Sequence, residues 1–281
     1  MATGTQLALD ESSSLEKQQT LFASLGELKS LLVAFSGGAD SAYLAWAAHH
    51  VLGERSLAVT ALSASFSRYD REQAEAFLRA TGIRHEWIGT QEFDNPLYVA
   101  NNADRCYHCK DELFDRMAEL AAKRGFLAVA YGVNADDTRD FRPGHRAARE
   151  HQVLAPLLDA SLHKDEIRQL SRIAGLSTWD RPASACLSSR IPYGTAVTPE
   201  LLDKIDRSEA VLRELGFRQF RVRAHGELAR VEVAPEEMSR ALAPSVAEQI
   251  AAGLKALGFA FVTLDLEGYR QGSLNSLLKT K

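Results

Sequence analysis

The sequence predicts an α/β fold with a mostly parallel sheet, followed by a smaller C-terminal α+β domain. Up to about residue 137, apolar runs of strand length alternate with amphipathic runs of helix length, which is typical of a parallel sheet with helices on both faces. From about Thr198 the pattern changes to a capped helix and a hairpin. With 281 residues and 46% hydrophobic content, the chain is long enough for two cores.

The first part of the chain predicts four strands separated by helices. An amphipathic helix is expected over residues 15–30. The predicted strands are 31–35, 56–66, 84–89 and 126–137, and the helices between them are 42–53, 70–82 and 110–124. Ligands of such sheets bind beyond the carboxyl ends of the strands. The loops that follow the strands are therefore the first place to look for a site.

The tail predicts a helix over residues 198–216, a hairpin over 217–233, and a further helix with the strand 259–266. The stretch 188–200 is rich in Gly, Pro and Ser, which is typical of a boundary. We therefore expect a nucleotide-binding domain over residues 1–195 and a substrate-binding or oligomerisation domain over residues 196–281.

Composition excludes several classes of protein. The formal net charge of −4 argues against a broad nucleic-acid surface, because such surfaces are strongly basic. The first residues lack a basic segment followed by an apolar one, and no apolar run approaches the roughly 20 residues of a membrane span. We expect a cytoplasmic protein without membrane or nucleic-acid partners. In that reducing compartment a CxxC pair is more often a metal or redox site than a disulfide.

The strongest local motif is VAFSGGADS, residues 33–41, which ends a predicted strand and opens a helix. Glycines let the backbone approach an anion, and N–H groups at the helix start point toward it. The Walker A and dinucleotide spacings are absent. A ligand-free turn with a serine cap is the competing interpretation, but the full string favours a phosphate cradle with Mg²⁺ on the carboxylate. The candidate ligands are Ser36, Gly37, Gly38, Asp40 and Ser41.

The chain has three cysteines: Cys106 and Cys109 in RCYHCK, and Cys186 in ASACLSSR. If they converge, three thiolates can hold three irons of a [4Fe–4S] cluster and leave the fourth iron open to carry sulfide. A structural zinc site needs four ligands, and His108 is poorly placed to be the fourth. A thioredoxin-type pair and three unrelated buried thiols remain as alternatives. The polarity of RCYHCK disfavours burial of the pair.

The string SGGADS resembles the pyrophosphate loop (PP-loop) of the adenine nucleotide alpha-hydrolase-like superfamily. That resemblance implies cleavage of ATP between the α- and β-phosphates and transfer of AMP to a substrate oxygen. Further strings, at residues 136–150, 183–198, 220–233 and 258–272, resemble the LarE family of sulfur transferases. The similarity runs from about Leu25 to Gly272.

Resemblance to the LarE family implies a reaction in two steps. ATP adenylates a carboxylate of pyridinium-3,5-biscarboxylic acid mononucleotide, and sulfur then displaces AMP to leave a thiocarboxylate for the nickel-pincer cofactor of lactate racemase. The three cysteines resemble the branch in which a [4Fe–4S] cluster delivers the sulfur. In the other branch, the residue matching Cys186 gives up its own sulfur and becomes dehydroalanine. The catalytic candidates are Cys186 and Asp40, and the resemblance also implies a hexamer and a downstream nickel-insertion protein.

Further residues are candidates for binding the substrate and the adenine. Arg221 and Arg223 alternate on one face of a predicted strand, spaced to share an anion, although a solvated charged face is the common alternative. The resemblance adds Glu209, and Lys110 lies beside the CxxC pair. Trp179, Asp180 and Arg181 precede the third cysteine and are candidates for the same cavity. Ser63 and Gly132, at predicted strand ends, are the expected adenine contacts.

Three other functions share parts of this pattern. A tRNA thiolase combines the same loop with three cysteines, but the acidic balance disfavours it. An amidating ligase would use ammonia on the same adenylate and would leave RCYHCK unexplained. A non-catalytic iron–sulfur or zinc protein would keep the nucleotide loop for regulation and would bind ATP without releasing pyrophosphate.

Overall fold

The computed structural model describes residues 11–139, 143–182, 184–270 and 272–274. The chain divides into two compact units. Unit 1 comprises Met1–Leu62, Arg71–Thr90 and Lys110–Ala183, and unit 2 comprises Ser63–Asp70, Gln91–Cys109 and Ser184–Lys281. Two internal segments of the first half of the chain thus group with the C-terminal residues.

Unit 1 contains a four-stranded parallel sheet, which confirms the predicted α/β class. Its strands are β1 Leu31–Ala34, β2 Ser56–Leu62, β3 His85–Gly89 and β4 Ala128–Tyr131, in the order β3-β2-β1-β4. Leu31 opposes Ser56 of β2 on one side and Ala128 of β4 on the other. The strand order reverses on either side of β1, and such a switch point is where open α/β sheets bind ligands.

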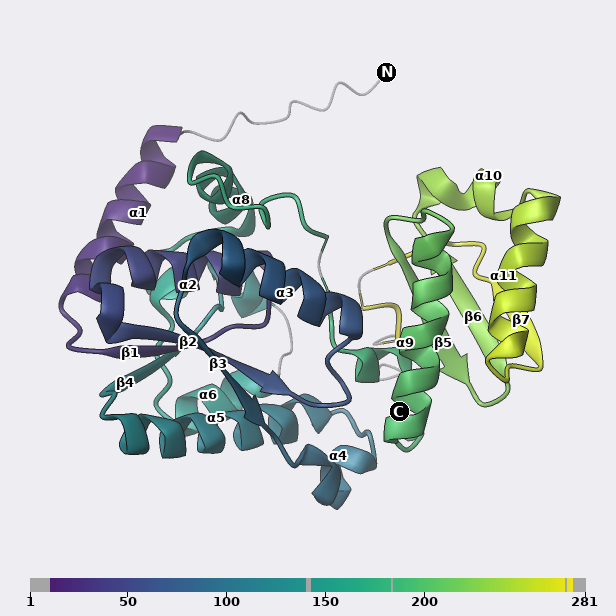
Figure 1. Ribbon diagram of the computed structural model, residues 1–281, viewed down its shortest axis with the longest axis horizontal. Coiled ribbons are helices and arrows are strands. Elements are labelled where there is room, and N and C mark those ends of the chain that lie inside the picture. The colour runs from purple at the N-terminus through teal and green to yellow at the C-terminus, as the bar shows by residue number, and fades with distance from the viewer. Residues whose placement is uncertain (1–10, 140–142, 183, 271, 275–281) are drawn as a thin grey trace. The chain divides into compact units, whose positions relative to one another are not determined.

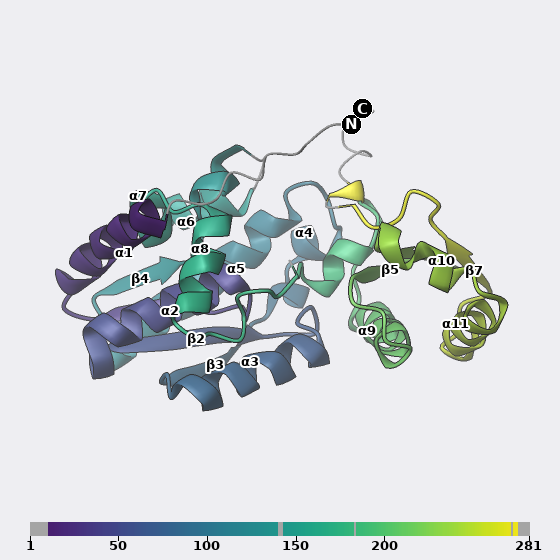
Figure 2. The ribbon, with the colours of Figure 1, turned by 90° about the horizontal axis from the view of Figure 1, so that it is seen from above.

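Helices cover both faces of this sheet (Figures 1 and 2). Helices α2 Ala39–Leu52 and α3 Arg68–Thr81 lie on one face, and α5 Arg105–Arg124 lies on the other. Helices α1 Glu11–Gly26 and α8 Lys164–Ile173 pack against α2. The shorter elements were not expected from the sequence: α4 Pro96–Val99, α6 Gly144–Glu150, α7 Pro156–Asp159, α10 Met238–Ala241, and the 3-10 turns η1 Gly53–Arg55, η2 Glu92–Asp94, η3 Ala135–Arg139, η4 Leu187–Arg190 and η5 Pro235–Glu237.

The core of unit 1 is built around β1 and α2. All four residues of β1 are buried, because the strand has neighbours on both sides and helices on both faces. Helix α2 is apolar around most of its circumference, since α1 and α8 cover the side that faces away from the sheet. Its Tyr43 is fully buried, and its hydroxyl accepts a hydrogen bond of 2.8 Å from Gln18 of α1. Burial raises the pKa of Tyr43 to about 12.

Unit 2 contains the predicted helix and hairpin. Helix α9 Pro199–Glu214 begins after Thr198, whose side chain accepts from the N–H of Leu201. Strands β5 Phe220–His225 and β6 Leu228–Val233 pair antiparallel, and β7 Phe261–Leu264 adds to β6 in parallel. Helix α11 Pro244–Ala256 packs against α9 and β7. One apolar cluster fills the unit; its members include Tyr98, Leu187, Leu202, Val222, Val231 and Leu254.

Two predicted strands were wrong in length. The strand predicted over 56–66 ends at Leu62, because the Ser63 hydroxyl accepts from the N–H of Ser65 and starts a turn. The strand predicted over 126–137 spans only Ala128–Tyr131. There the Asn134 side chain accepts from the N–H of Asp136 and curls the chain away from the sheet. Both turns fall at the carboxyl ends of strands, where a ligand-binding edge is expected.

Among the described helices, none combines the length and the apolar character that crossing a bilayer requires.

A buried hydrogen-bond chain predicts how stability depends on pH. Thr60 donates to the carbonyl of Phe35, so its hydroxyl accepts the N–H of His85 Nε2 at 2.8 Å. Burial lowers the pKa of His85 to about 4, against the raising effect of Glu75 and Glu86. The unfolded chain therefore binds more protons than the folded chain between pH 4 and the ordinary histidine pKa of about 6.5. We expect the free energy of unfolding to fall as pH drops through this window.

The substitution His85→Gln keeps a donor for Thr60 but cannot take up a proton. Urea unfolding at pH 5 and pH 7 should show a smaller loss of stability for this variant than for the wild type. Equal losses in the two proteins would show that other groups cause the pH dependence.

Candidate active site

The motif SGGADS forms the turn between β1 and α2. Gly37 adopts the left-handed conformation, with φ of +74°, and Gly38 is the N-cap of α2 without a side-chain cap. The hydroxyl of Ser41 accepts from the N–H of Ser36 at 3.1 Å and donates to the carbonyl of Gly38 at 3.1 Å. The first turn of α2 thus presents backbone N–H groups that no side chain caps, which is a geometry that binds phosphate.

Gly132 fits closely against this turn. A Cβ atom at Gly132 would lie 2.8 Å from the backbone nitrogen of Ser41 and 2.9 Å from its Cα. Only glycine lets the chain after β4 approach the first turn of α2 so closely. The predicted adenine contact Gly132 therefore lies directly beside the phosphate loop. The other predicted adenine contact, Ser63, follows β2 and belongs to unit 2.

Asp40 carries an unpartnered buried oxygen. Its Oδ2 accepts from Asn134 at 3.2 Å, whereas Oδ1 is buried without a partner among the described residues. Burial raises the pKa of Asp40, and Asp137 adds to this effect, while Lys164 opposes it. A bound cation would relieve both the burial of the charge and the repulsion between the carboxylates. Carboxylate oxygens are also the donors that Mg²⁺ prefers, so this donor set fits the predicted ion.

A second turn that the sequence did not single out completes this edge of unit 1. Residues Asn134, Asp136 and Asp137 follow β4, and Asp136 accepts from the N–H of Lys164 at 2.8 Å and contacts His163 Nδ1 at 2.8 Å. Asp137 accepts from the N–H of Asn134 at 3.2 Å. In the sequence, the letters NADD at residues 134–137 could have predicted this turn, because Asn and Asp side chains often bond to the backbone in turns. The turn ties the loop after β4 to the first turn of α8 and sets Asn134 against Asp40.

Arginines complete the surroundings of the loop. Arg181 donates to the carbonyl of Gly37 at 2.6 Å, and Arg168 in turn donates to the carbonyls of Trp179 and Arg181. Arg181 was a candidate for the cavity of the third cysteine, a role that stays a prediction. Its guanidinium lies on the glycine-rich loop, where a fixed positive charge complements phosphate. Among the described residues, Asp180 forms no ion pair, and Trp179 is 40% exposed.

The three cysteines all belong to unit 2. Cys106 and Cys109 lie one turn apart at the start of α5, and Cys186 immediately precedes η4. Cys106 and Cys186 are exposed, and Cys109 packs against the apolar core. Burial raises the pKa of Tyr98, and the charges of Cys186 and Cys109 add to it.

Hydrogen bonds join the two cysteine segments. The hydroxyls of Tyr98 and Ser188 lie 2.8 Å apart, and Arg105 donates to the carbonyl of Ser188 at 2.7 Å. Arg105 also contacts the sulfur of Cys106 at 3.8 Å. These contacts bring the CxxC pair and the stretch after Cys186 together, as a shared cluster requires. Three soft sulfur donors and an open position fit a [4Fe–4S] cluster.

The cysteines do not form a site for one small ion. Among the described residues, the group whose ligand atoms all lie within 4.8 Å of one another is Asp111, Asp115 and His151. There both ring nitrogens of His151 face carboxylates, at 2.8 Å and 3.7 Å, as in an ion-pair network. Ligands of a four-iron cluster bind different irons, so their sulfur atoms need not approach as closely as the ligands of a single ion.

Of the predicted substrate-binding residues, Arg221 and Arg223 lie on β5 of unit 2 and Glu209 lies on α9. Glu209 is buried, and its two oxygens accept from Arg190 at 2.9 and 3.0 Å. Arg223 is 5% exposed and pairs with Glu232 at 2.8 Å, while its Nε is buried without a partner. Burial lowers the pKa of Arg221, and the neighbouring Arg190 adds to this effect. Crowded guanidiniums of this kind gain from a bound anion. Lys110 belongs to unit 1 and lies 5.9 Å from the ring centre of Phe114.

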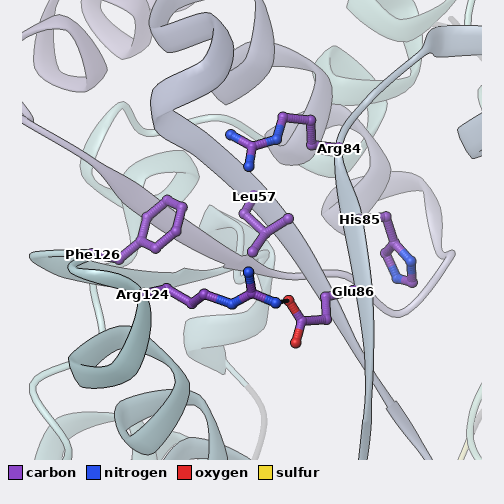
Figure 3. Close-up of a pocket in the computed structure, with 6 residues that line it drawn as sticks. All are labelled: Leu57, Arg84, His85, Glu86, Arg124 and Phe126. Carbon is purple, nitrogen blue, oxygen red and sulfur yellow. Dashed lines mark hydrogen bonds and ion pairs between the residues drawn. The ribbon is translucent and has the colours of Figure 1, made fainter.

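A pocket of about 440 Å³ lies at the opposite edge of the unit 1 sheet (Figure 3). It is lined by Leu57, Arg84, His85, Glu86, Arg124 and Phe126. These residues stand at the amino ends of β2 and β3 and just before β4. In Figure 3 the Arg124 guanidinium reaches Glu86, with which it forms an ion pair of 2.9 Å. Parallel sheets bind ligands at their carboxyl ends, so this pocket lies at the end of the sheet where a ligand is not expected.

Substitution of Gly132 should disturb the phosphate loop. In Gly132→Ala the new methyl group would meet the backbone of Ser41, and we expect a loss of about 1–3 kcal/mol in stability. The amide of Ala42, which bonds to the carbonyl of Gly38, should exchange its hydrogen faster. Gly89→Ala is the matched control, because a Cβ there meets nothing within 4 Å. Urea unfolding and hydrogen exchange measure both effects, and equal behaviour of the two variants would contradict the close approach.

Comparison with known proteins identifies the family. No protein-family model matches the chain. An uncharacterized protein of Synechocystis sp. is 44% identical over 266 residues, which cover 95% of this chain and 98% of that protein. An uncharacterized protein of Methanocaldococcus jannaschii is 26% identical over 86% of this chain and 91% of its own length. The pyridinium-3,5-bisthiocarboxylic acid mononucleotide synthase of Lactiplantibacillus plantarum is 34% identical over 93% of this chain and 95% of its own length. At this identity and coverage, the chain belongs to the LarE family, the family of that synthase.

Proposed function

We propose that this protein is an ATP-dependent sulfur transferase. It adenylates a carboxylate of pyridinium-3,5-biscarboxylic acid mononucleotide, releases pyrophosphate, and then replaces AMP with sulfur to form a thiocarboxylate. The name of the Lactiplantibacillus relative states a product with two thiocarboxylic groups, so sulfur has to enter the molecule. The observation that carries the proposal is that Arg105 and Tyr98 hydrogen-bond Ser188, which joins the CxxC segment to the residues directly after Cys186.

The phosphate loop of unit 1 supports the first step. A carboxylate oxygen is a poor leaving group, and adenylation converts it into AMP. The uncapped N–H groups at the start of α2 and the guanidinium of Arg181 stabilise the charge of the departing pyrophosphate. Mg²⁺ supplies further charge stabilisation when bound, and the unpartnered Oδ1 of Asp40 is the ligand we assign to it.

The cysteines of unit 2 support the second step. Sulfur is nucleophilic at neutral pH without the general base that a hydroxyl needs. Cys106, Cys109 and Cys186 would hold a [4Fe–4S] cluster, which would supply the sulfur for transfer when bound. Cys186 is exposed, so its sulfur is accessible to a substrate. We assign the substrate's phosphate or carboxylate to Arg223, which is buried, and to Arg221, which is half-buried.

Separate loss of the two steps tests the proposal. Asp40→Asn should lower pyrophosphate release by about a hundredfold or more, because several kcal/mol of transition-state stabilisation are lost with the cation. Cys186→Ala should release pyrophosphate normally but form no thiocarboxylate. Release of pyrophosphate and mass spectrometry of the pyridinium product measure the two steps. Full activity of Asp40→Asn would overturn the assignment of the loop, and thiocarboxylate formation by Cys186→Ala would overturn the role of that cysteine.

Iron content tests the source of the sulfur. After anaerobic purification we expect about four iron and four acid-labile sulfide per chain. Cys106→Ser should lose most of both, whereas His108→Gln, altered between the same two cysteines, should keep them. If the wild type holds neither after reconstitution, the cluster assignment is wrong. Loss of hydrogen sulfide from Cys186 during turnover, seen in the mass of the chain, would then show that the cysteine itself is the sulfur donor.

A further inference from the structure

Arg105 is a buried arginine whose charge has no carboxylate partner in the described structure. It lies immediately before Cys106 and is 4% exposed. Buried guanidiniums are costly unless they are paired. The other buried arginines of unit 2 follow that rule, because Arg190 pairs with Glu209 and Arg223 pairs with Glu232. Arg105 is the exception.

The hydrogen-bond partners of Arg105 are neutral oxygens and a sulfur. Its Nη1 donates to the side-chain oxygen of Asn101 at 2.6 Å and to the carbonyl of Ser188 at 2.7 Å, and its Nη2 lies 3.8 Å from the sulfur of Cys106. Among these hydrogen-bond partners, the sulfur of Cys106 is the group that becomes an anion when a cysteine ligates metal.

Asn101 extends the same network along the chain that follows Cys186. It is fully buried and adopts the left-handed conformation, with φ of +54°. Its side-chain amide donates to the carbonyls of Pro192 and Thr195 at 2.9 and 3.0 Å, and its own carbonyl accepts from the N–H of Gly194 at 3.0 Å. Arg105 thus connects the CxxC helix to a segment held from Ser188 to Thr195.

We propose that Arg105 is a positioning residue of the cysteine site: it holds the stretch after Cys186 against the CxxC pair, and it compensates the negative charge of the thiolate ligands. This inference rests on the proposed function, in which those thiolates hold a [4Fe–4S] cluster. Cysteine ligands bind metal as anions, so three of them in one place need a nearby positive charge. A guanidinium meets both needs, because its fork bridges two segments while its charge is permanent.

Three variants separate the two roles. Arg105→Met removes the charge and the bridge while keeping a side chain of similar length. Arg105→Lys keeps the charge, but a single ammonium does not reproduce the fork that reaches both Asn101 and Ser188. Tyr98→Phe is the control: it removes one tie to Ser188 and changes no formal charge. Thermal unfolding of each variant checks that unit 2 remains folded.

Two measurements report the two roles. In the metal-free protein, hydrogen exchange at Ile191 and Gly194 reports how well the segment after Cys186 is held. We expect exchange to be about tenfold or more faster in both Arg105 variants, as for the loss of hydrogen bonds to a charged group. In the iron-loaded protein, a redox titration followed by electron paramagnetic resonance reports the charge. The midpoint potential should shift to a more negative value in Arg105→Met and stay near that of the wild type in Arg105→Lys and Tyr98→Phe.

The outcomes distinguish this inference from the proposed function. An unchanged potential in Arg105→Met with full iron content would overturn charge compensation, and unchanged exchange would overturn positioning. A wild type without iron after reconstitution would overturn the cluster and, with it, charge compensation. Exchange in the metal-free variants would still decide whether Arg105 positions Cys186.

Discussion

The cysteine-bearing unit depends on one buried ion pair, between Arg190 and Glu209. Their side chains are 3% and 5% exposed, so both charges have left water at a cost of several kcal/mol each. The cost is met because the two groups pair through two N–H donors and because other contacts use their remaining positions. Glu209 also accepts from the N–H of Val222, and Arg190 also donates to the carbonyl of Cys186. One pair therefore joins α9, β5 and the segment of Cys186.

The glycine-rich loop of unit 1 relies on backbone geometry instead. This loop has no buried ion pair in the described structure; it is shaped by the left-handed Gly37 and by the close approach of Gly132 to Ser41. Backbone N–H groups carry only partial charges, which can remain unpaired at a helix start until an anion binds. Backbone N–H groups at a helix start therefore need no buried countercharge while the site is empty. Beside this loop, the Oδ1 of Asp40 is buried without a partner among the described residues, and burial raises the pKa of this carboxyl.

The contrast between the buried arginines links stability to chemistry. Where an arginine meets a carboxylate, as at Glu209 and Glu232, the pair is complete and holds secondary structure together. Arg105, by contrast, contacts the sulfur of Cys106 and neutral oxygens of Asn101 and Ser188, and it has no carboxylate partner among the described residues.

The sequence by itself determined the parallel sheet, the hairpin, the SGGADS turn and the isolated cysteine motif, because each is written in local periodicity or in neighbouring residues. It did not show that β2 ends at Leu62 and β4 ends at Tyr131. Beyond these ends, the side chains of Ser63 and Asn134 accept hydrogen bonds from the backbone. Only the tertiary structure placed Arg181 on the phosphate loop and Arg105 between Cys106 and Ser188. The contacts of Arg181 with Gly37 and of Arg105 with Ser188 join residues that are 144 and 83 positions apart. Their geometry follows from how helices and strands pack, which no local pattern encodes.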